Sequence, residues 1–128
     1  MRLNLELLPY RLAVARLDAA AVVPGWLSGA FTSVSRTPDE LSVICDSDAV
    51  PGDVAARRNW RCVRVRGSIP FDEVGILAAL ADPLRDAGIP IFVISTFDTD
   101  YVLVDEGHLS AARRVLEGAG HSVVVVDR

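Results

Sequence analysis

The sequence contains no lysine: all thirteen basic residues are arginines, against seventeen acidic residues. The formal net charge of −4 argues against nucleic acid or an anionic membrane surface as the main partner. The sequence also lacks an apolar run long enough for a signal peptide or a membrane span. We therefore expect a cytoplasmic protein that binds neither nucleic acid nor a membrane.

Cysteine and histidine are scarce, with two of each. Cys45 and Cys62 lie in strand-like runs without metal-ligand or redox spacing, so we expect reduced core residues. His108 and His121 have no accompanying nucleophile or ligand pattern, and we expect both at the surface. Ser95 lacks the flanking glycines of a nucleophile elbow. These absences favour a protein that is not an enzyme and uses no metal or cofactor.

The most regular pattern lies between residues 71 and 101. Asp72 is the expected N-cap of a helix, Pro83 should kink it or loosen its last turns, and Gly88 followed by Pro90 should end it. The apolar residues of this segment recur at helical spacing and predict one buried stripe. They are Ile76, Leu77, Leu80, Ala81, Leu84 and Ala87.

The second half of the chain predicts a complete βαββαβ unit. Strands are expected at 60–66, 91–97, 101–104 and 122–126, and a second helix at 108–118. This order is ferredoxin-like, with both helices on one face of an antiparallel sheet. The last strand is too uniformly apolar to be exposed on both faces.

The first half predicts strands at 4–8, 12–17, 31–36 and 41–45, but at most a short, broken helix at 18–28. It also resembles the second half at a shift of sixty residues. The aligned pairs include Ser35 with Ser95, Glu40 with Asp100, Leu41 with Tyr101 and Val43 with Leu103. We infer two copies of one module: residues 1–58, degraded in both helices, and residues 59–128, complete.

The motifs Gly75-Ile-Leu, Ala87-Gly88-Ile and Ser95-Thr-Phe-Asp-Thr-Asp100-Tyr resemble those of the ACT domain, a small regulatory amino-acid-binding module. They look most like the tandem ACT regions of aspartate kinases and cytosolic arginine sensors. The resemblance is close over residues 60–126 and weak over the first half. It implies an α+β fold of two ferredoxin-like (βαββαβ) ACT modules, the first degenerate and the second complete, in a non-catalytic, allosteric protein.

The resemblance also implies a site. ACT domains bind amino acids at the seam between two modules, through a helix start and a strand end. Amides at a helix N-terminus suit the ligand carboxylate, and aspartates suit its ammonium. Because the arginine sensors carry four modules and this chain at most two, we expect a homodimer. Mapped by motif, the ligand-binding residues are Asp72, Glu73, Val74, Gly75, Ile76, Ser95, Thr96, Phe97, Asp98 and Asp100.

Each of these residues also has a purely structural interpretation. Gly75 can be a tolerated helix glycine, Asp72 a cap and Glu73 a solvated first-turn residue. Asp98 and Asp100 suit a tight hairpin turn. The alternative function is therefore an ACT module without a ligand, used for dimerisation or for docking on a partner enzyme.

An arginine-rich stripe at residues 57–66, with Trp60, is the strongest nucleic-acid signal in the chain. The RNA-recognition version of this fold needs aromatic motifs on the central strands, and these are absent. We therefore interpret the stripe as an interface or a solvated sheet face.

Overall fold

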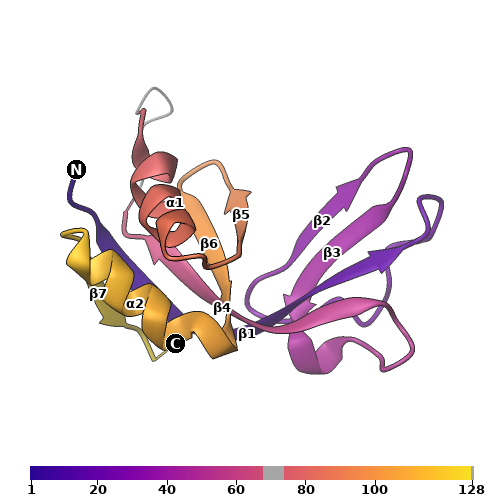
Figure 1. The fold of residues 1–128 in the computed structure, drawn as a ribbon. Coiled ribbons are helices and arrows are strands. Elements are labelled where there is room, and N and C mark those ends of the chain that lie inside the picture. The colour runs from indigo at the N-terminus through magenta and orange to yellow at the C-terminus, as the bar shows by residue number, and fades with distance from the viewer. Residues whose placement is uncertain (68–73, 128) are drawn as a thin grey trace. The chain divides into compact units, whose positions relative to one another are not determined.

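The computed structural model describes residues 1–67 and 74–127 (Figure 1). No helix within these ranges is long and apolar enough to cross a membrane. In chain order the elements are β1 (Asn4–Leu17), β2 (Ser33–Arg36), β3 (Leu41–Asp46), the 3-10 turn η1 (Ser47–Ala49), β4 (Ala56–Val65), α1 (Ile76–Asp86), β5 (Ile91–Ser95), β6 (Asp100–Asp105), the 3-10 turn η2 (Glu106–His108), α2 (Leu109–Gly118) and β7 (Ser122–Val125).

The chain divides into two compact units. Unit 1 consists of Met1–Pro9 and Arg61–Arg128, and unit 2 consists of Tyr10–Trp60. This division differs from the single boundary predicted between residues 58 and 59. The first nine residues belong to the unit of the C-terminal half because the start of β1 pairs with β7, Leu5 lying opposite Val123.

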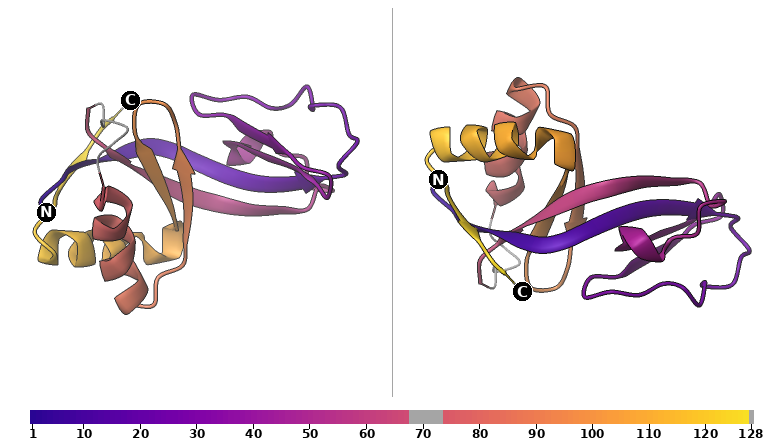
Figure 2. Two further views of the ribbon diagram at one scale, coloured as in Figure 1. Left: turned by 90° about the horizontal axis from the view of Figure 1, so that it is seen from above. Right: turned by 90° about the horizontal axis from the view of Figure 1, so that it is seen from below.

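The strand order in unit 1 is β7-β1-β4-β6-β5. The predicted succession of strand, helix, strand, strand, helix and strand is confirmed as β4, α1, β5, β6, α2 and β7. β1 is an additional strand between the last and the first of these four. Because β1 and β7 are parallel, the sheet is mixed and not wholly antiparallel as predicted. Both helices lie on the same side of these strands (Figure 2).

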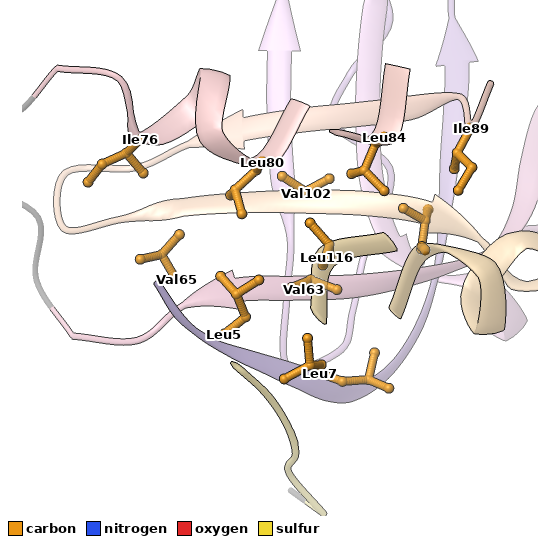
Figure 3. Packing of buried hydrophobic residues seen from close by; sticks show 13 residues of the cluster. Leu5, Leu7, Val63, Val65, Ile76, Leu80, Leu84, Ile89, Val102 and Leu116 are labelled. Atoms are coloured by element: carbon orange, nitrogen blue, oxygen red, sulfur yellow. The ribbon is translucent and has the colours of Figure 1, made fainter. Parts of the chain in front are cut away.

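One hydrophobic core fills the space between the helices and the unit 1 sheet (Figure 3). α1 contributes Ile76, Leu80 and Leu84, which confirms the centre of the predicted stripe, whereas Leu77 and Ala87 are exposed. The strands contribute alternate residues, as a sheet with one covered face requires. The buried members are Leu5, Leu7, Val63, Val65, Ile76, Leu80, Leu84, Ile89, Val102, Val104, Ala112, Leu116 and Val123.

α1 continues through Pro83 and ends in a closed turn, not in the loosened one that we predicted. Gly88, with a φ of +72°, adopts the left-handed conformation that glycine tolerates, and the Ile89 N–H donates to the Leu84 carbonyl at 3.0 Å. A proline has no N–H, so Pro83 cannot donate to the carbonyl of Ala79, four residues earlier.

Unit 2 contains no α-helix at any of its residues, all of which the structure describes. Its strands follow the order β2-β3-β1-β4. The segment 18–32 has no regular structure, and Arg36 supports it by donating to the carbonyls of Ala19 and Ala21. The buried core of unit 2 consists of Ala13, Ala15, Leu41, Val43, Cys45 and Val50.

Two strands differ from their prediction. β1 is one continuous strand of 14 residues, not two strands separated at Pro9, because the φ of proline is compatible with extended backbone. β7 was predicted to be shielded, but Val124 is 55% exposed and Val125 is 50% exposed. β7 pairs with β1 alone among the described strands, and an edge strand has less cover than a central one.

The hairpins β2–β3 and β5–β6 repeat at an offset of 59 residues, not sixty. The Thr37 N–H donates to the Glu40 carbonyl, and the Thr96 N–H donates to the Thr99 carbonyl, each at 2.9 Å. The strand registers keep the same offset, with Arg36 opposite Leu41 and Ser95 opposite Asp100. The predicted alignment was wrong by one residue, which would place each side chain on the opposite face of its strand.

Candidate functional site

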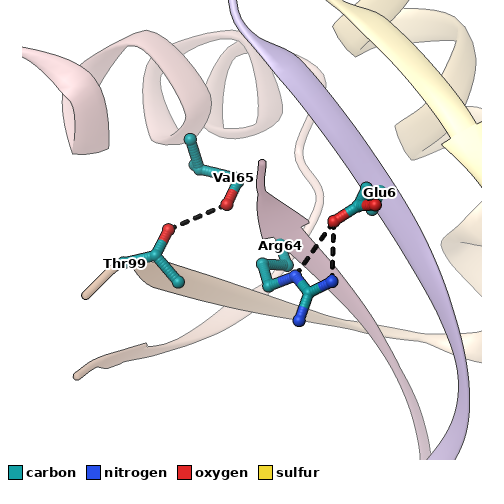
Figure 4. A network of polar contacts seen from close by, with 4 residues as sticks. All are labelled: Glu6, Arg64, Val65 and Thr99. Atoms are coloured by element: carbon teal, nitrogen blue, oxygen red, sulfur yellow. Dashed lines mark hydrogen bonds and ion pairs between the residues drawn. The ribbon is translucent and has the colours of Figure 1, made fainter. Parts of the chain in front are cut away.

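The predicted ligand residues that the structure describes lie at one end of the unit 1 sheet. Figure 3 shows Ile76, the first residue of α1, at the same end as Val65, the last residue of β4. The turn between β5 and β6 reaches this end too, because the Thr99 hydroxyl donates to the Val65 carbonyl at 2.9 Å (Figure 4). Asp72 and Glu73 lie outside the described residues.

The N-cap of α1 is Gly75, so the prediction of Asp72 at that position is wrong. Gly75 has a φ of +86°, which explains a glycine here without any ligand. No side chain among the described residues caps this helix start. The first N–H groups of a helix have no partner within the helix and carry partial positive charge, so they suit an anion.

Residues 74–76 differ in what they can offer a ligand. The Ile76 side chain is 8% exposed and belongs to the core, so only its backbone N–H can contact a ligand. Val74, in contrast, is 82% exposed. The helix start therefore combines backbone donors with one accessible apolar side chain.

The β5–β6 turn presents a carboxylate that is already oriented. The Ser95 hydroxyl donates to Oδ1 of Asp100 at 2.7 Å, and Asp100 is half-buried. A carboxylate has two oxygens and several acceptor positions, so Asp100 can hold Ser95 and still accept from an ammonium group. Phe97 and Asp98 are exposed at the tip of the turn.

Besides the Ser95–Asp100 contact, the side-chain hydrogen bonds described for this turn come from its threonines. The Thr96 hydroxyl donates to the Thr99 carbonyl at 3.1 Å and accepts from the Thr99 N–H at 3.4 Å. Thr99 is 6% exposed, and our sequence analysis did not select it. The sequence feature that could have identified Thr99 is its position between two aspartates, since a threonine there can point inward while its neighbours face water.

Two arginines of the stripe on β4, Arg64 and Arg61, are bonded within unit 1. Nε and Nη2 of Arg64 donate to Oε1 of Glu6 at 3.0 and 2.7 Å (Figure 4). The Glu6 carboxylate, with a further contribution from Tyr101, raises the pKa of Arg64. Arg61 donates to the carbonyl of Leu8 at 3.3 Å. These contacts connect β4 to β1 and β6, which gives both arginines a role within the sheet.

A groove of about 350 Å³ opens beside the start of α1. His121 lines it but is only 5% exposed, so the surface position predicted for this residue is wrong. Nδ1 of His121 accepts from the Leu3 N–H and Nε2 contacts the Ala79 carbonyl, each at 3.0 Å. The lining residues are Met1, Gly75, Ala78, Ala79, Asp82, Pro83, Asp86, Ala119 and His121.

The second histidine is also less exposed than predicted. His108 is half-buried, and its Nδ1 is buried without a hydrogen-bond partner in the described part of the chain. Both cysteines are buried and free, which confirms their predicted core positions. Burial raises the pKa of the Cys62 thiol to about 12 and also raises that of Cys45.

Comparison with known families and proteins gives two kinds of match. The ACT domain model matches residues 55–118, and a model of an N-terminal domain family matches residues 11–53. The chain is 35% identical over 108 residues to the cytosolic arginine sensor for mTORC1 subunit 1 from Bos taurus. That alignment covers 78% of this chain and 33% of the relative, so the chain spans about a third of the length of the curated relatives it matches.

Solved structures resemble the whole chain. Protein Atu0741 from Agobacterium tumefaciens superposes with a TM-score of 0.94 at 40% identity, over 100% of this chain and 96% of that chain. The regulatory subunit of aspartate kinase from Thermus flavus superposes with a TM-score of 0.63 at 13% identity, over 94% and 97% of the two chains, which is a likeness of fold alone. The ACT match covers half of the residues, and the chain belongs to the ACT domain family.

Proposed function

We propose that this chain is a non-catalytic regulatory protein that binds a free amino acid at the end of unit 1 formed by the α1 start and the β5–β6 turn. One observation carries the proposal: the Ser95–Asp100 pair lies at the same end of the sheet as a helix start that no described side chain caps. The comparisons support a regulatory role: one relative is named as an arginine sensor, and one structure of similar fold is named as the regulatory subunit of aspartate kinase.

The two ends of α-amino acids match the two parts of the site. The ligand carboxylate would accept hydrogen bonds from the first N–H groups of α1, next to Gly75, where the helix dipole favours negative charge. Asp72 and Glu73 precede this helix start and stay in the proposed ligand set. The N-terminal end of α1 thus provides the anion-binding half.

The ammonium half is the hairpin turn. Asp100 would accept a hydrogen bond from the ligand ammonium while it keeps its hydrogen bond from the Ser95 hydroxyl. A charge-assisted hydrogen bond of this kind is stronger than a neutral one. Asp98 adds a second carboxylate, and the backbone of Thr96 adds a carbonyl acceptor. The exposed Phe97 and Val74 provide apolar contact area at the rim.

We propose further that a second copy of the chain completes the site. In this arrangement the amino acid lies at the seam between two ACT modules, one from each protomer of a cytoplasmic homodimer. A partner enzyme would then respond to the liganded dimer. A large exposed aromatic such as Phe97, 80% accessible, is the kind of residue that an interface covers.

We also propose that unit 2 is a degenerate ACT module. Its support is the hairpin β2–β3, which repeats the turn bond and the strand register of β5–β6 at a constant offset. Unit 2 contains no α-helix, so it has no α-helix start to bind a carboxylate. On this proposal the amino-acid site belongs to unit 1.

A thermal-shift screen against the twenty amino acids at millimolar concentration tests the main proposal. A ligand at about a hundred times its Kd stabilises the native state by about 2.7 kcal/mol, which raises the Tm by several degrees. Asp100→Asn should abolish the shift, because the variant keeps the shape of the side chain and loses its charge. Asp53→Asn, at an exposed position of unit 2, is the matched control and should leave the shift intact.

The alternative function is a docking or dimerisation module without a ligand, and the exposed Val124 and Val125 on edge strand β7 favour it. An edge strand offers unpaired backbone groups to another chain. In that case no amino acid raises the Tm, and Val124→Arg converts a dimer to monomers in sedimentation velocity. If an amino acid raises the Tm and Asp100→Asn removes the effect, the alternative fails.

A further inference from the structure

His121 lies where α1, α2 and β1 meet in unit 1. Its backbone position is set by the end of α2, where Gly120 has a φ of +99° and the His121 N–H donates to the Leu116 carbonyl at 3.1 Å. Its ring then extends between Leu3, at the start of β1, and Ala79 in α1. One buried side chain therefore connects three elements.

The partners of the ring fix its protonation state. The Ala79 carbonyl can only accept, so Nε2 must carry a hydrogen; this carbonyl has no helical donor, because residue 83 is a proline. The Leu3 N–H can only donate, so Nδ1 must be unprotonated. Only the neutral imidazole with its hydrogen on Nε2 satisfies both contacts.

A second proton would break this arrangement. The imidazolium form has an N–H on both nitrogens, so Nδ1 could no longer accept from Leu3 and two donors would face each other. At 5% exposure, water does not readily replace the lost bond. We propose that His121 is a proton-operated latch: its protonation releases residues 1–3 from α1 and opens the groove beside Gly75.

The charges that face the ring act in both directions. Asp82 and Asp86 of α1 line the same groove and favour a positive ring, although Arg85 lies 3.4 Å from the first and 3.0 Å from the second. On the β1 side are two positive charges: Arg2, whose Nε lies 3.7 Å from where a Cβ on Gly120 would be, and the amino group of Met1, a residue that lines the groove.

On α2, Arg113 and Glu117 pair with each other at 3.6 Å, and Arg114 adds a further positive charge to this helix.

Opening of the latch reaches the start of α1 through Met1, because the charged ring still donates from Nε2 to the Ala79 carbonyl and only the Leu3 bond is lost. Cε of Met1 lies 3.9 Å from where a Cβ on Gly75 would be. Release would therefore leave the first turn of α1 less fixed. If the proposed function holds, amino-acid binding should weaken on acidification. The latch itself does not depend on a ligand.

Two NMR measurements on the ligand-free protein test the latch between pH 8 and pH 5. At pH 8 the side-chain ¹⁵N spectrum should show a neutral His121 ring protonated on Nε2. As the ring becomes positive, the hydrogen-exchange protection of the Leu3 amide, corrected for intrinsic exchange, should fall by about tenfold or more. The amides of α1 should shift over the same pH range.

Substitutions separate the latch from a purely structural role. His121→Asn places an oxygen near Nδ1 and cannot be protonated, so Leu3 should stay protected throughout this pH range. His108→Gln removes the other histidine and should leave the pH profile unchanged. The proposal is overturned if His121 becomes protonated while Leu3 keeps its protection, or if the ring is still neutral and bonded at pH 5. Both outcomes are readable in the wild-type protein, even if a variant fails to fold.

Discussion

The two hairpins have the same turn and use its flanking positions in opposite ways. At the pair next to the turn, β5–β6 places Ser95 and Asp100, which hydrogen-bond to each other at the surface. The corresponding pair in β2–β3 is Arg36, which supports a loop, and Leu41, which is fully buried. A shared backbone geometry therefore does not imply a shared function, because the surroundings decide what each flanking side chain contacts.

The residue that ends each turn differs in the same way. Thr99 is buried and bonds β4, whereas Glu40, at the equivalent position of unit 2, is half-exposed. Unit 1 covers its sheet with two helices, while unit 2 covers its core with side chains from irregular segments, including Trp26 and Leu27. The β5–β6 turn thus lies beside a helix start, and unit 2 has none.

The largest difference in stability between the two hairpins is expected when the residues that follow their turns, Leu41 and Asp100, are each replaced by the residue type of the other. Leu41→Asp places a carboxylate at a position that is 0% exposed, and an unpaired buried charge is among the most destabilising changes known. We expect a loss of about 4 kcal/mol or more in the free energy of unfolding, measured with urea. The reciprocal Asp100→Leu should cost less than about 1 kcal/mol. Similar costs for the two variants would contradict the difference in burial.

Removing the link from the turn to β4 should have the next largest effect. Thr99→Val deletes the hydroxyl that donates to Val65 and leaves that carbonyl without its partner, which costs about 1–3 kcal/mol. Glu40→Val, at the equivalent position in unit 2, should change stability by about 0.5 kcal/mol or less. The free energies of unfolding of both variants, measured with urea, test this difference. Equal losses would mean that the Thr99 bond adds nothing particular to unit 1.

Most of unit 1 could be predicted from the sequence because its signals are local. Helical spacing located α1, and strand patterns located β4, β5 and β6. The inserted position of β1 could not be predicted, since pairing between residues 4–7 and 122–125 joins distant parts of the chain. The exposure of Val124 was missed for the same reason, because a valine run has the same pattern in a central strand and an edge strand.

The site was predictable as a motif but not as a geometry. Ser95 and Asp100 were selected by resemblance, and their direct bond follows from the hairpin register, which the sequence left ambiguous by one residue. The surface position predicted for His121 was wrong because its partners are distant in the chain: the Leu3 N–H, and the Ala79 carbonyl, which has no helical donor because residue 83 is a proline. Thr99 was missed because its acceptor, the Val65 carbonyl, is on another strand.

The two buried cysteines, Cys62 in unit 1 and Cys45 in unit 2, allow the stabilities of the two units to be compared at alkaline pH. The folded-state pKa of Cys62 is raised to about 12 from an ordinary value of 9.0, so the native thiol stays protonated while the unfolded one ionises. The associated stability is complete below about pH 9 and is lost between pH 9 and pH 12, by about 1.4 kcal/mol per unit.

Cys62→Val should therefore reduce the loss of stability between pH 8 and pH 10 by about 1 kcal/mol, read from urea midpoints. For Cys45 in unit 2, burial raises the pKa and a hydrogen bond with the Ser28 backbone partly offsets the rise. The same substitution at Cys45 should thus have a smaller effect. No lysine titrates in this range, because the sequence contains none. A larger effect at Cys45 than at Cys62 would contradict the expectation that the pKa of Cys62 is raised more.

The smallest expected effect distinguishes the two turn tips. Asp98 in unit 1 and Asp39 in unit 2 are equivalent at the offset of 59 residues, and both are exposed. Neither carboxylate is needed for the turn, whose side-chain bonds come from Thr96 and Thr37. Asp98→Asn and Asp39→Asn should therefore each change stability by no more than about 0.5 kcal/mol.

Ligand binding should separate these matched variants even though stability does not. On the proposed function, Asp98 contributes a second, solvent-screened negative charge near the ligand ammonium, so its loss should weaken binding by about twofold to fivefold. Asp39 is in the unit without a helix start, and its variant should bind like the wild type. Isothermal titration with the amino acid that gives the largest thermal shift measures both. Equal weakening would mean that net charge matters, whereas a change at Asp98 alone would place the ammonium at the β5–β6 turn, because the two substitutions alter the charge of the chain identically.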